Sequence, residues 1–468
     1  MGRTTGIVAA GIAAAAVVTG VAVGAAIVAP AKAELAADAI PIGSGLGRDW
    51  HLGGFSDLYP KGMSGKEFTS ITDRGPNFDA GTGAAAACPQ TTPVGTKVYP
   101  LPGFTPEILH LGIKDDELRV KQRIALSFPN GPAVGFSVRS GGRNEISVDG
   151  SCASLGTSPY GIDSEGIVED PRDGSFWIAD EYLPSVMRVT QDGTVVNRVV
   201  PLGTESSATG TGAAVIGAFP QTIGTNFRTN RGFEGIAISP DGKTLYTALQ
   251  SPMDYRTTGA ERPDPNPRNS LALRVFRLDI SNPAAAAVTA QWIYPLDKAS
   301  GNSPLADKVS TLTWLGVDRI AVEERDDPAN DPNDNPQNTT NTRLYLADFS
   351  SVAPIAPGSV WNGAGAGGKT LEQWYIPGQG AGAPADLPKA AKKCLWVNVA
   401  QALVDAGFTD PTSPARAGNG KIEGVAYVEA HGTNPALLAV LNDNDFGLAV
   451  PIREQLDVLA APPLCTPS

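Results

Sequence analysis

Three short segments repeat an acid, a glycine and a branched apolar residue, and each is followed by a second apolar segment that ends in acids or amides. The triplets are Glu165-Gly166-Ile167, Glu234-Gly235-Ile236 and Glu423-Gly424-Val425. The segments that follow them end in Asp180-Glu181, Gln250 and Asn442-Asp443. Because a hairpin returns its second strand to the place where the first began, we expect the acids of both strands to meet at one end. Carboxylates gathered in this way repel one another unless a cation neutralises them.

Two looser copies extend this pattern. One carries Asp57 and returns to Asp73 and Arg74, and the other covers residues 309–313 and returns to Glu324 and Arg325. A hard cation with oxygen ligands suits such a set, and we expect Ca²⁺. The predicted metal ligands are Asp57, Asp73, Glu165, Glu234, Glu423, Asn442 and Asp443. A carboxylate of the same cluster would act as the base toward a water molecule, and the candidates are Glu165, Asp180, Glu181 and Glu324.

Arginines stand next to the acidic positions. Arg74, Arg231 and Arg325 carry planar guanidinium groups that suit phosphate or carboxylate oxygens, so we predict that they bind an anionic small ester or phosphoester. A metal and arginines together would neutralise charge that develops in the transition state. The same residues also have a structural interpretation, in which the acids accept backbone N–H groups and the arginines form salt bridges with neighbouring acids.

Several familiar catalytic patterns are absent from the sequence. There is no G-x-S-x-G nucleophile elbow, no Walker loop and no dinucleotide-binding glycine motif. The three histidines, His51, His110 and His431, have no zinc-binding spacing. The chemistry of this chain therefore depends on its carboxylates.

The elements that must position these acids are short strands. Further strand-like segments follow each hairpin, such as residues 186–189, 195–200, 273–278 and 291–294, which gives about four strands per repeat. We therefore predict an all-β fold, a β-propeller of five or six four-stranded blades. A β-sandwich is the alternative, but it would not require the repeat.

The repeats are unevenly spaced, which predicts loop insertions. Segments rich in Gly, Pro, Thr, Asn or Asp lie at residues 80–94, 201–228, 255–269 and 326–342. Residues 395–406 mix strand and helix character, and we leave them open. No linker divides the chain, so we expect a single domain over residues 40–468.

Composition narrows the possible partners. The chain has 468 residues, 53 glycines and 39 prolines, and a net charge of −12. Nucleic acid is excluded as a partner because its phosphates require a basic face. We expect a monomer that acts on a small molecule.

The N-terminus resembles an export signal. Arg3 precedes an apolar run over residues 6–29, and Ala31-Lys32-Ala33 has the small-residue pattern of a cleavage site. We predict a signal peptide over residues 1–33, cleaved after Ala33, and a secreted or cell-envelope protein. The alternative is an uncleaved N-terminal membrane anchor.

Four cysteines fit an exported chain, because an even number in an oxidising compartment predicts disulfides. Three pairings are possible, and proximity in the sequence favours Cys88 with Cys152 and Cys394 with Cys465.

The motifs taken in order resemble the family called "esterase-like activity of phytase". The segments that carry the resemblance are F-T-S-I-T-D-R-G-P-N at 68–77, S-E-G-I-V-E-D-P-R-D-G-S-F-W-I-A-D-E-Y at 164–182, the N-R-G-F-E-G-I-A-I-S-P-D-G segment that begins at Asn230, and the K-I-E-G-V-A segment that begins at Lys421. The resemblance covers about residues 45–447 and implies a secreted propeller with phytase-like or esterase-like activity. The segment at 326–342 and the loop around Cys88 depart from a simple copy of the family.

Three functional hypotheses follow. The first is an extracellular metal-assisted phosphoesterase or esterase. The second is a propeller without catalysis that binds a ligand or a cell-envelope partner. The third is a lactonase-like hydrolase, which would use the acidic metal site but would need the arginines less.

Overall fold

The computed structural model describes nine ranges of the chain: residues 30–35, 40–91, 95–138, 144–255, 263–297, 308–325, 342–408, 421–448 and 454–467. The predicted apolar run at 6–29 lies outside these ranges, as does nearly all of the predicted insertion at 326–342. No helix in the described ranges is long and apolar enough to cross a membrane.

All five predicted hairpins are present as antiparallel strand pairs. The Asp-Gly turns of two of them place Gly174 and Gly242 at positive φ, which glycine adopts without strain. The pairs are β4 (Phe55–Pro60) with β5 (Glu67–Thr72), β13 (Ser164–Glu169) with β14 (Phe176–Asp180), β18 (Phe233–Ile238) with β19 (Thr244–Leu249), β22 (Lys308–Gly316) with β23 (Arg319–Arg325), and β26 (Ile422–Val428) with β27 (Leu437–Asn442).

Two further antiparallel strands extend each hairpin outward into a four-stranded unit. We number the units 1 to 5 by their first strands, β4, β13, β18, β22 and β26. The outer strands are β8 (Glu107–Lys114) and β9 (Glu117–Ala125) in unit 1, β15 (Ser185–Val189) and β16 (Val195–Pro201) in unit 2, β20 (Ala272–Asp279) and β21 (Ala287–Pro295) in unit 3, β24 (Arg343–Asp348) and β25 (Lys392–Asn398) in unit 4, and β28 (Gln455–Ala460) and β1 (Ala31–Glu34) in unit 5.

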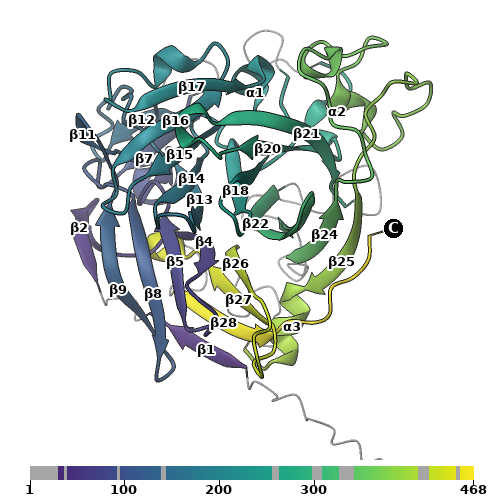
Figure 1. Ribbon diagram of the computed structural model, residues 1–468. Coiled ribbons are helices and arrows are strands. Elements are labelled where there is room, and N and C mark those ends of the chain that lie inside the picture. Colours follow the sequence, from purple (N-terminus) through teal and green to yellow (C-terminus); the bar gives the residue numbers. More distant parts are fainter. Residues whose placement is uncertain are drawn as a thin grey trace, which may run out of the picture.

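The first strands of the units surround a common centre. Each contacts the next in the order β4, β13, β18, β22 and β26, and β26 contacts β4 again. Figure 1 shows these strands around the middle of the molecule, with the outer strands at the periphery. The fold is therefore nearly all-β and closes on itself, in agreement with the predicted class.

The closure brings together segments from both ends of the chain. β1 pairs with β28 over four residues, and it meets β9 of unit 1 in parallel at Glu34 and Glu117. Ala33 is fully buried there. Cleavage after Ala33, the predicted position, would remove three of the four residues of β1.

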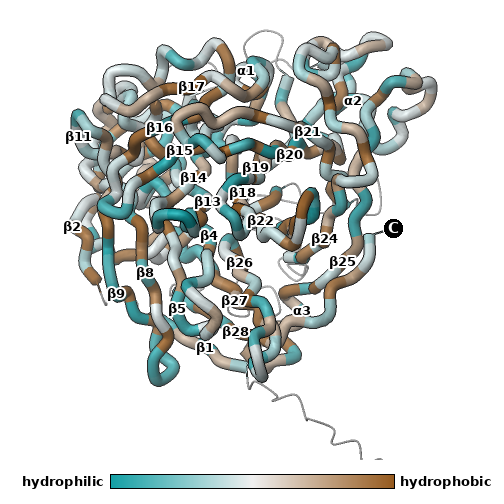
Figure 2. Tube along the Cα trace, viewed as in Figure 1, coloured by the Kyte–Doolittle hydropathy of each residue, from teal (hydrophilic) through white to brown (hydrophobic). Residues whose placement is uncertain are grey.

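Apolar side chains fill the spaces between neighbouring units. One cluster joins Trp177 and Val199 of unit 2 to Phe233 and Phe276 of unit 3, and another joins Tyr246 and Trp292 of unit 3 to Val322 of unit 4. Figure 2 shows apolar segments along the strands and many hydrophilic ones at the turns. Successive side chains of a strand point to opposite faces of its sheet, so each unit packs apolar side chains against both neighbouring units. This packing holds the units in place.

The segment predicted as a loop at 201–228 contains regular structure. It holds a 3₁₀ turn (Glu205–Ser207), the strand β17 (Ala214–Phe219), which pairs in parallel with β16, and the helix α1 (Gln221–Asn226). The loop interpretation was wrong here because the small residues Ala and Gly interrupt the apolar pattern of β17, and its parallel pairing with β16 has no local sequence signal. Residues 395–406, for which no structure was predicted from the sequence, cover the end of β25 and the helix α3 (Val399–Asp405).

The remaining elements are short. They are β2 (Pro41–Gly45), β3 (Arg48–His51), β6 (Phe78–Asp79), β7 (Thr96–Tyr99), β10 (Ser127–Phe128), β11 (Gly131–Pro132), β12 (Ile146–Asp149), α2 (Leu371–Trp374), and the 3₁₀ turns Gly83–Ala85, Pro267–Asn269, Pro283–Ala285, Val360–Asn362 and Asp445–Gly447.

Both predicted disulfides are confirmed. Cys88 is bonded to Cys152, and Cys394 is bonded to Cys465. The first joins the insertion at 80–91 to the turn after β12, and the second fastens the C-terminal tail to β25.

Candidate acidic metal site

A bulge interrupts the first strand of every unit at the same place in the repeat. The pairing register shifts next to Gly166, Gly235 and Gly424, and it shifts again at Asp57 and Thr311 in the other two units. A Cβ on Gly166 would lie 2.3 Å from the carbonyl oxygen of Glu234, and one on Gly235 would lie 2.3 Å from that of Ser310. The glycines therefore allow the first strands to approach closely at the centre.

Asp57 and Thr311 occupy the positions where the other units have glycine, and their side chains fill the centre. The Asp57 carboxylate accepts hydrogen bonds from the Thr311 hydroxyl (2.6 Å), from Leu58 N (2.8 Å) and from Ile167 N (2.8 Å). Thr311 also donates to the carbonyl oxygen of Glu423 (3.1 Å). Asp57 therefore links units 1, 2 and 4, and its oxygens are already bonded to protein groups.

Next to Asp57 and Thr311, the ends of the hairpins contribute two layers of side chains to the centre. The residue before each bulge forms the first layer: Ser56, Glu165, Glu234, Ser310 and Glu423. The residue that follows the return strand, or ends it, forms the second layer: Asp73, Glu181, Gln250, Arg325 and Asp443. In four units the second-layer N–H donates to a carbonyl two residues before the first-layer residue, at 2.7–2.9 Å, which confirms that the positions are equivalent.

The side of units 3 to 5 is neutralised by protein cations. Arg325 donates to Ser310 Oγ (2.5 Å) and pairs with Glu234 (3.3 Å) and with Glu423. Lys421 pairs with Glu423 (3.5 Å), Asp445 (2.6 Å) and Asp443. Although burial raises the pKa of Glu423, Arg325 and Lys421 lower it to about 2, so this carboxylate is charged. Glu234 also accepts from Gln250 Nε2 (2.7 Å).

The side of units 1 and 2 has an excess of acids. Oxygens of Glu165, Glu181 and Glu234 lie within 4.8 Å of one another, and so do oxygens of Asp73, Asp163 and Glu165. Glu165 belongs to both groups and is their shared member. A third group, of Asp73, Asp443 and Asp445, continues the cluster toward Lys421. We call Asp73, Asp163, Glu165 and Glu181 the acidic cluster.

Two oxygens of the acidic cluster have no hydrogen-bond partner among the described residues. They are Glu181 Oε1 and Asp163 Oδ1, and the two side chains are 1% and 0% exposed. A buried unpaired carboxylate oxygen is costly, by about 1–3 kcal/mol. This arrangement calls for a proton or a cation at the cluster.

Burial and mutual repulsion act on these acids in the same direction. Burial raises the pKa of Glu165 well above its usual value, and Glu234, Asp163 and Glu181 raise it further. Burial likewise raises the pKa of Glu181, with Glu234 and Asp163 adding to the effect. Burial raises the pKa of Asp73 to about 6 against the opposing charges of Arg74 and Lys421. Without a metal ion, the carboxyl groups of the cluster therefore stay protonated at pH values at which exposed Asp and Glu side chains are ionised.

The donor set fits a hard divalent cation. Every group of potential ligands consists of carboxylate oxygens, with no imidazole or thiolate in any group found in the described ranges. Oxygen ligands favour Ca²⁺, Mg²⁺ or Mn²⁺ over zinc or copper. Among these acids, Glu165, Glu181, Asp163 and Asp73 could hold such an ion.

The predicted substrate-binding arginines are engaged with the protein. Arg74 donates to Asp163 (2.9 Å), to Glu145 (3.0 Å) and to Tyr182 OH (3.2 Å), and it is 6% exposed. Arg325 bridges units as described above, and Arg231 donates to Ser251 Oγ (2.7 Å). The arginines thus converge on the acids, as counter-ions in the case of Arg74 and Arg325.

Three predicted site residues lie apart from the acidic cluster. Asp180 pairs with Arg198 and accepts from Asp163 N (3.0 Å), facing away from Glu181 because neighbours on a strand point to opposite sides. Glu324 accepts from Tyr294 OH (2.5 Å) and pairs with Lys393 in the outer strands. Asn442 Oδ1 accepts from Gln455 N (2.6 Å). We leave these residues, and Asp57, out of the proposed site.

Sequence reasoning missed two residues of the site, Asp163 and Lys421. Both stand two positions before a first-layer residue, so strand alternation places them on the same side as Glu165 and Glu423. That period of two is the signal that could have identified them.

The chain belongs to the phytase-like family described as "esterase-like activity of phytase", whose pattern matches residues 51–446. An uncharacterized secreted protein of Arthroderma benhamiae is 27% identical over 185 residues, which cover 36% of this chain and 35% of that protein. The match thus spans about a third of that relative's length.

Comparison with solved structures gives only weak likenesses. The allergen Mala s 1 of Malassezia sympodialis matches with a TM-score of 0.32 and 10% identity over 91% of this chain and 82% of its own. A luciferin-regenerating enzyme also matches with a TM-score of 0.32 and 10% identity, over 92% of this chain and 95% of its own. A periplasmic gluconolactonase of Pseudomonas aeruginosa matches with a TM-score of 0.25 and 12% identity, over 64% of this chain and 70% of its own.

The Arg325 ion pairs give a first prediction. Arg325→Gln leaves Glu234 and Glu423 buried without their shared cation, so it should lower the free energy of unfolding by about 3–5 kcal/mol. The control is Arg319→Gln, since Arg319 pairs with Asp348 at the surface and is 56% exposed, where such pairs contribute about 0–1 kcal/mol. Urea denaturation would measure both. Equal effects of the two substitutions would contradict the role assigned to Arg325.

The raised pKa values give a second prediction, for the chain in a metal chelator. Burial raises the pKa of Asp73 to about 6 and that of Asp57 to about 7, from a value near 3.8 in the unfolded chain. The folded state therefore binds more protons between about pH 4 and pH 7, so stability should fall as pH rises through this window. Asp73→Asn removes one of these groups and should flatten the fall. A stability that rises with pH across the window would contradict these assignments.

Proposed function

We propose that this protein is a metal-assisted hydrolase of ester bonds, with its site at the acidic cluster of units 1 and 2. The observation that carries the proposal is the pair of buried oxygens, Glu181 Oε1 and Asp163 Oδ1, that lack partners in the described structure next to Glu165. Membership of the phytase-like family supports hydrolysis as the reaction class.

We propose the following roles for the residues of the site. Glu165, Asp163 and Asp73 would hold the cation, which supplies Lewis acidity to an ester oxygen when bound. Glu181 lies beside them with a raised pKa, which suits a group that takes a proton from water and returns it to the leaving oxygen. Arg74 would orient Asp163 through its 2.9 Å bond. Tyr182, which Arg74 also contacts, would help to hold that guanidinium in place.

The contacts of the arginines support one substrate class over another. A phosphoester would require cations that are available to its oxygens, but Arg74 and Arg325 are bonded to acids of the protein. We therefore propose a carboxylic ester or a lactone, with less charge than the anionic substrate expected from the sequence. A phosphoester is the second candidate, supported by the family's description.

The wider setting is also part of the proposal. We propose that the five units are the blades of a five-bladed β-propeller, supported by the cyclic contacts of their first strands. We propose that the chain is exported, supported by the N-terminal signal pattern, the two disulfides and the secreted relative. We also propose that it acts as a monomer on small molecules and does not bind nucleic acid.

Calorimetry with Ca²⁺ tests the metal site, using Glu165→Gln and a matched control. Glu165 belongs to two of the three carboxylate groups, so its substitution should weaken binding at least about tenfold, or about 1.4 kcal/mol. Glu169→Gln in the same strand should bind as the wild type does, because Glu169 pairs with Lys61 (3.2 Å) at the other end of β13. Equal binding by wild type and Glu165→Gln would place the ion elsewhere.

Activity assays then test the reaction. We expect hydrolysis of p-nitrophenyl acetate or a γ-lactone that chelator abolishes and Glu181→Gln reduces by about 10²-fold or more. Faster hydrolysis of p-nitrophenyl phosphate would favour the phosphoesterase. Tight Ca²⁺ binding with no hydrolysis of any of these would contradict catalysis and favour a propeller that only binds a ligand.

A further inference from the structure

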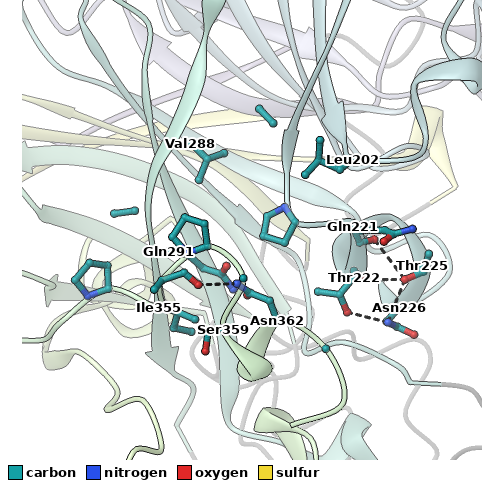
Figure 3. Close-up of a pocket in the computed structure, with 18 of the residues that line it drawn as sticks. Leu202, Gln221, Thr222, Thr225, Asn226, Val288, Gln291, Ile355, Ser359 and Asn362 are labelled. Carbon is teal, nitrogen blue, oxygen red and sulfur yellow. Dashed lines mark hydrogen bonds between the residues drawn. The ribbon is translucent and has the colours of Figure 1, made fainter.

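A cleft of about 870 Å³ lies on the outer side of units 2 and 3, away from the acidic cluster. Its walls come from β17 and α1, from β21, and from the segment 354–364 that precedes β25. Figure 3 shows these walls, with Gln291 of β21 and Thr222 and Asn226 of α1 among the labelled residues. None of the residues of the two layers lines the cleft. It is therefore a separate feature of the molecule.

The lining of the cleft carries no charge. Its polar side chains are amides and hydroxyls, and the rest are mainly proline, alanine and larger aliphatic residues, together with Tyr255. Leu202, which lines the cleft, is 48% exposed. In a chain with a net charge of −12, an uncharged concavity of this size is selective against ions and favours a neutral, mainly apolar molecule.

One buried donor in the cleft has no partner in the described structure. Gln291 is 2% exposed, and its Nε2 makes no hydrogen bond to the described residues. The backbone oxygen of Gln291 is already bonded to Ile355 N (2.7 Å), which fixes the strand against the 354–364 segment. Because Gln291 is one of the lining residues, its buried and unpaired amide N–H₂ group would gain an acceptor if the oxygen of a ligand reached it.

The walls are held in shape by their own hydrogen bonds. Asn226 donates to Thr222 Oγ1 (2.8 Å) and to Thr225 Oγ1 (3.1 Å) on one side. On the other side, Arg274 donates to Asn362 Oδ1 (3.0 Å), and Asn362 in turn donates to the carbonyl oxygen of Ala356 (3.1 Å). A cleft with fixed walls loses little conformational entropy when a ligand enters.

We propose that this cleft is a second binding site, for a neutral and mainly apolar small molecule whose carbonyl or hydroxyl oxygen accepts a hydrogen bond from Gln291 Nε2. The site does not depend on the acidic cluster, so it stands whether or not that cluster is catalytic.

The test is a titration of the full chain with Nile red, a neutral apolar dye that has a ring carbonyl and fluoresces in apolar surroundings. We expect saturable binding with one dye per chain. Ala356→Trp fills the cleft from an exposed position and should abolish this binding, whereas Ala353→Trp, exposed in the same segment but outside the lining, should not change it. Gln291→Leu keeps the side-chain size but removes the donor, and should weaken binding about fivefold.

Two results would overturn the proposal. One is the absence of saturable binding by the wild type. The other is equal binding by the wild type and Ala356→Trp, which would place the dye elsewhere on the surface. If Gln291→Leu fails to fold, the two tryptophan variants still decide the matter, because both sites are in an exposed segment.

Discussion

The structure depends on one electrostatic constraint, the convergence of five hairpin ends around a single centre. Each hairpin brings one first-layer and one second-layer side chain there, and seven of these ten side chains are ionisable, six of them acids. Such charges cannot stay buried without partners, because an isolated charge loses the free energy of its hydration and gains no compensating interaction. Arg325 meets this requirement for Glu234 and Glu423, and it joins β18, β22 and β26 at the same time.

The neutralisation of the acids is uneven around the centre, and the proposed metal site lies on the side with the excess of acids. Arg325 and Lys421 come from units 4 and 5 and compensate the acids on their own side. On the side of units 1 and 2, Arg74 is the counter-ion of Asp163, while Glu165 and Glu181 face further acids. Below the layers, Asp57 and Thr311 fill the space that glycine leaves in the other units. The acids of the two layers that have no ion-pair partner among the described residues therefore lie together at one end of the centre, in the acidic cluster.

Much of this arrangement could be predicted from the sequence, because repeats and Asp-Gly turns are local signals. The five hairpins, the meeting of Glu165 with Glu181 and the pairing of Cys88 with Cys152 all follow from spacing along the chain. The sequence did not predict which of the acids are neutralised by arginine or lysine side chains. That depends on contacts such as Arg325 with Glu423, 98 residues apart, and no local pattern encodes it. Asp180 and Glu324 were misplaced for a simpler reason, since strand alternation turns them away from Glu181 and Arg325. The strand β17 was hidden because its pairing with β16 is tertiary.

A crystal structure of the protein soaked with Mn²⁺ tests the metal site most directly, because anomalous scattering locates this hard divalent ion without ambiguity. If the proposed site is correct, an anomalous peak will lie within about 2.0–2.6 Å of carboxylate oxygens of Glu165, Asp163 and Asp73. A crystal in which the ion binds only at surface acids, with the acidic cluster closed by hydrogen bonds between protonated carboxyls, would contradict the metal site.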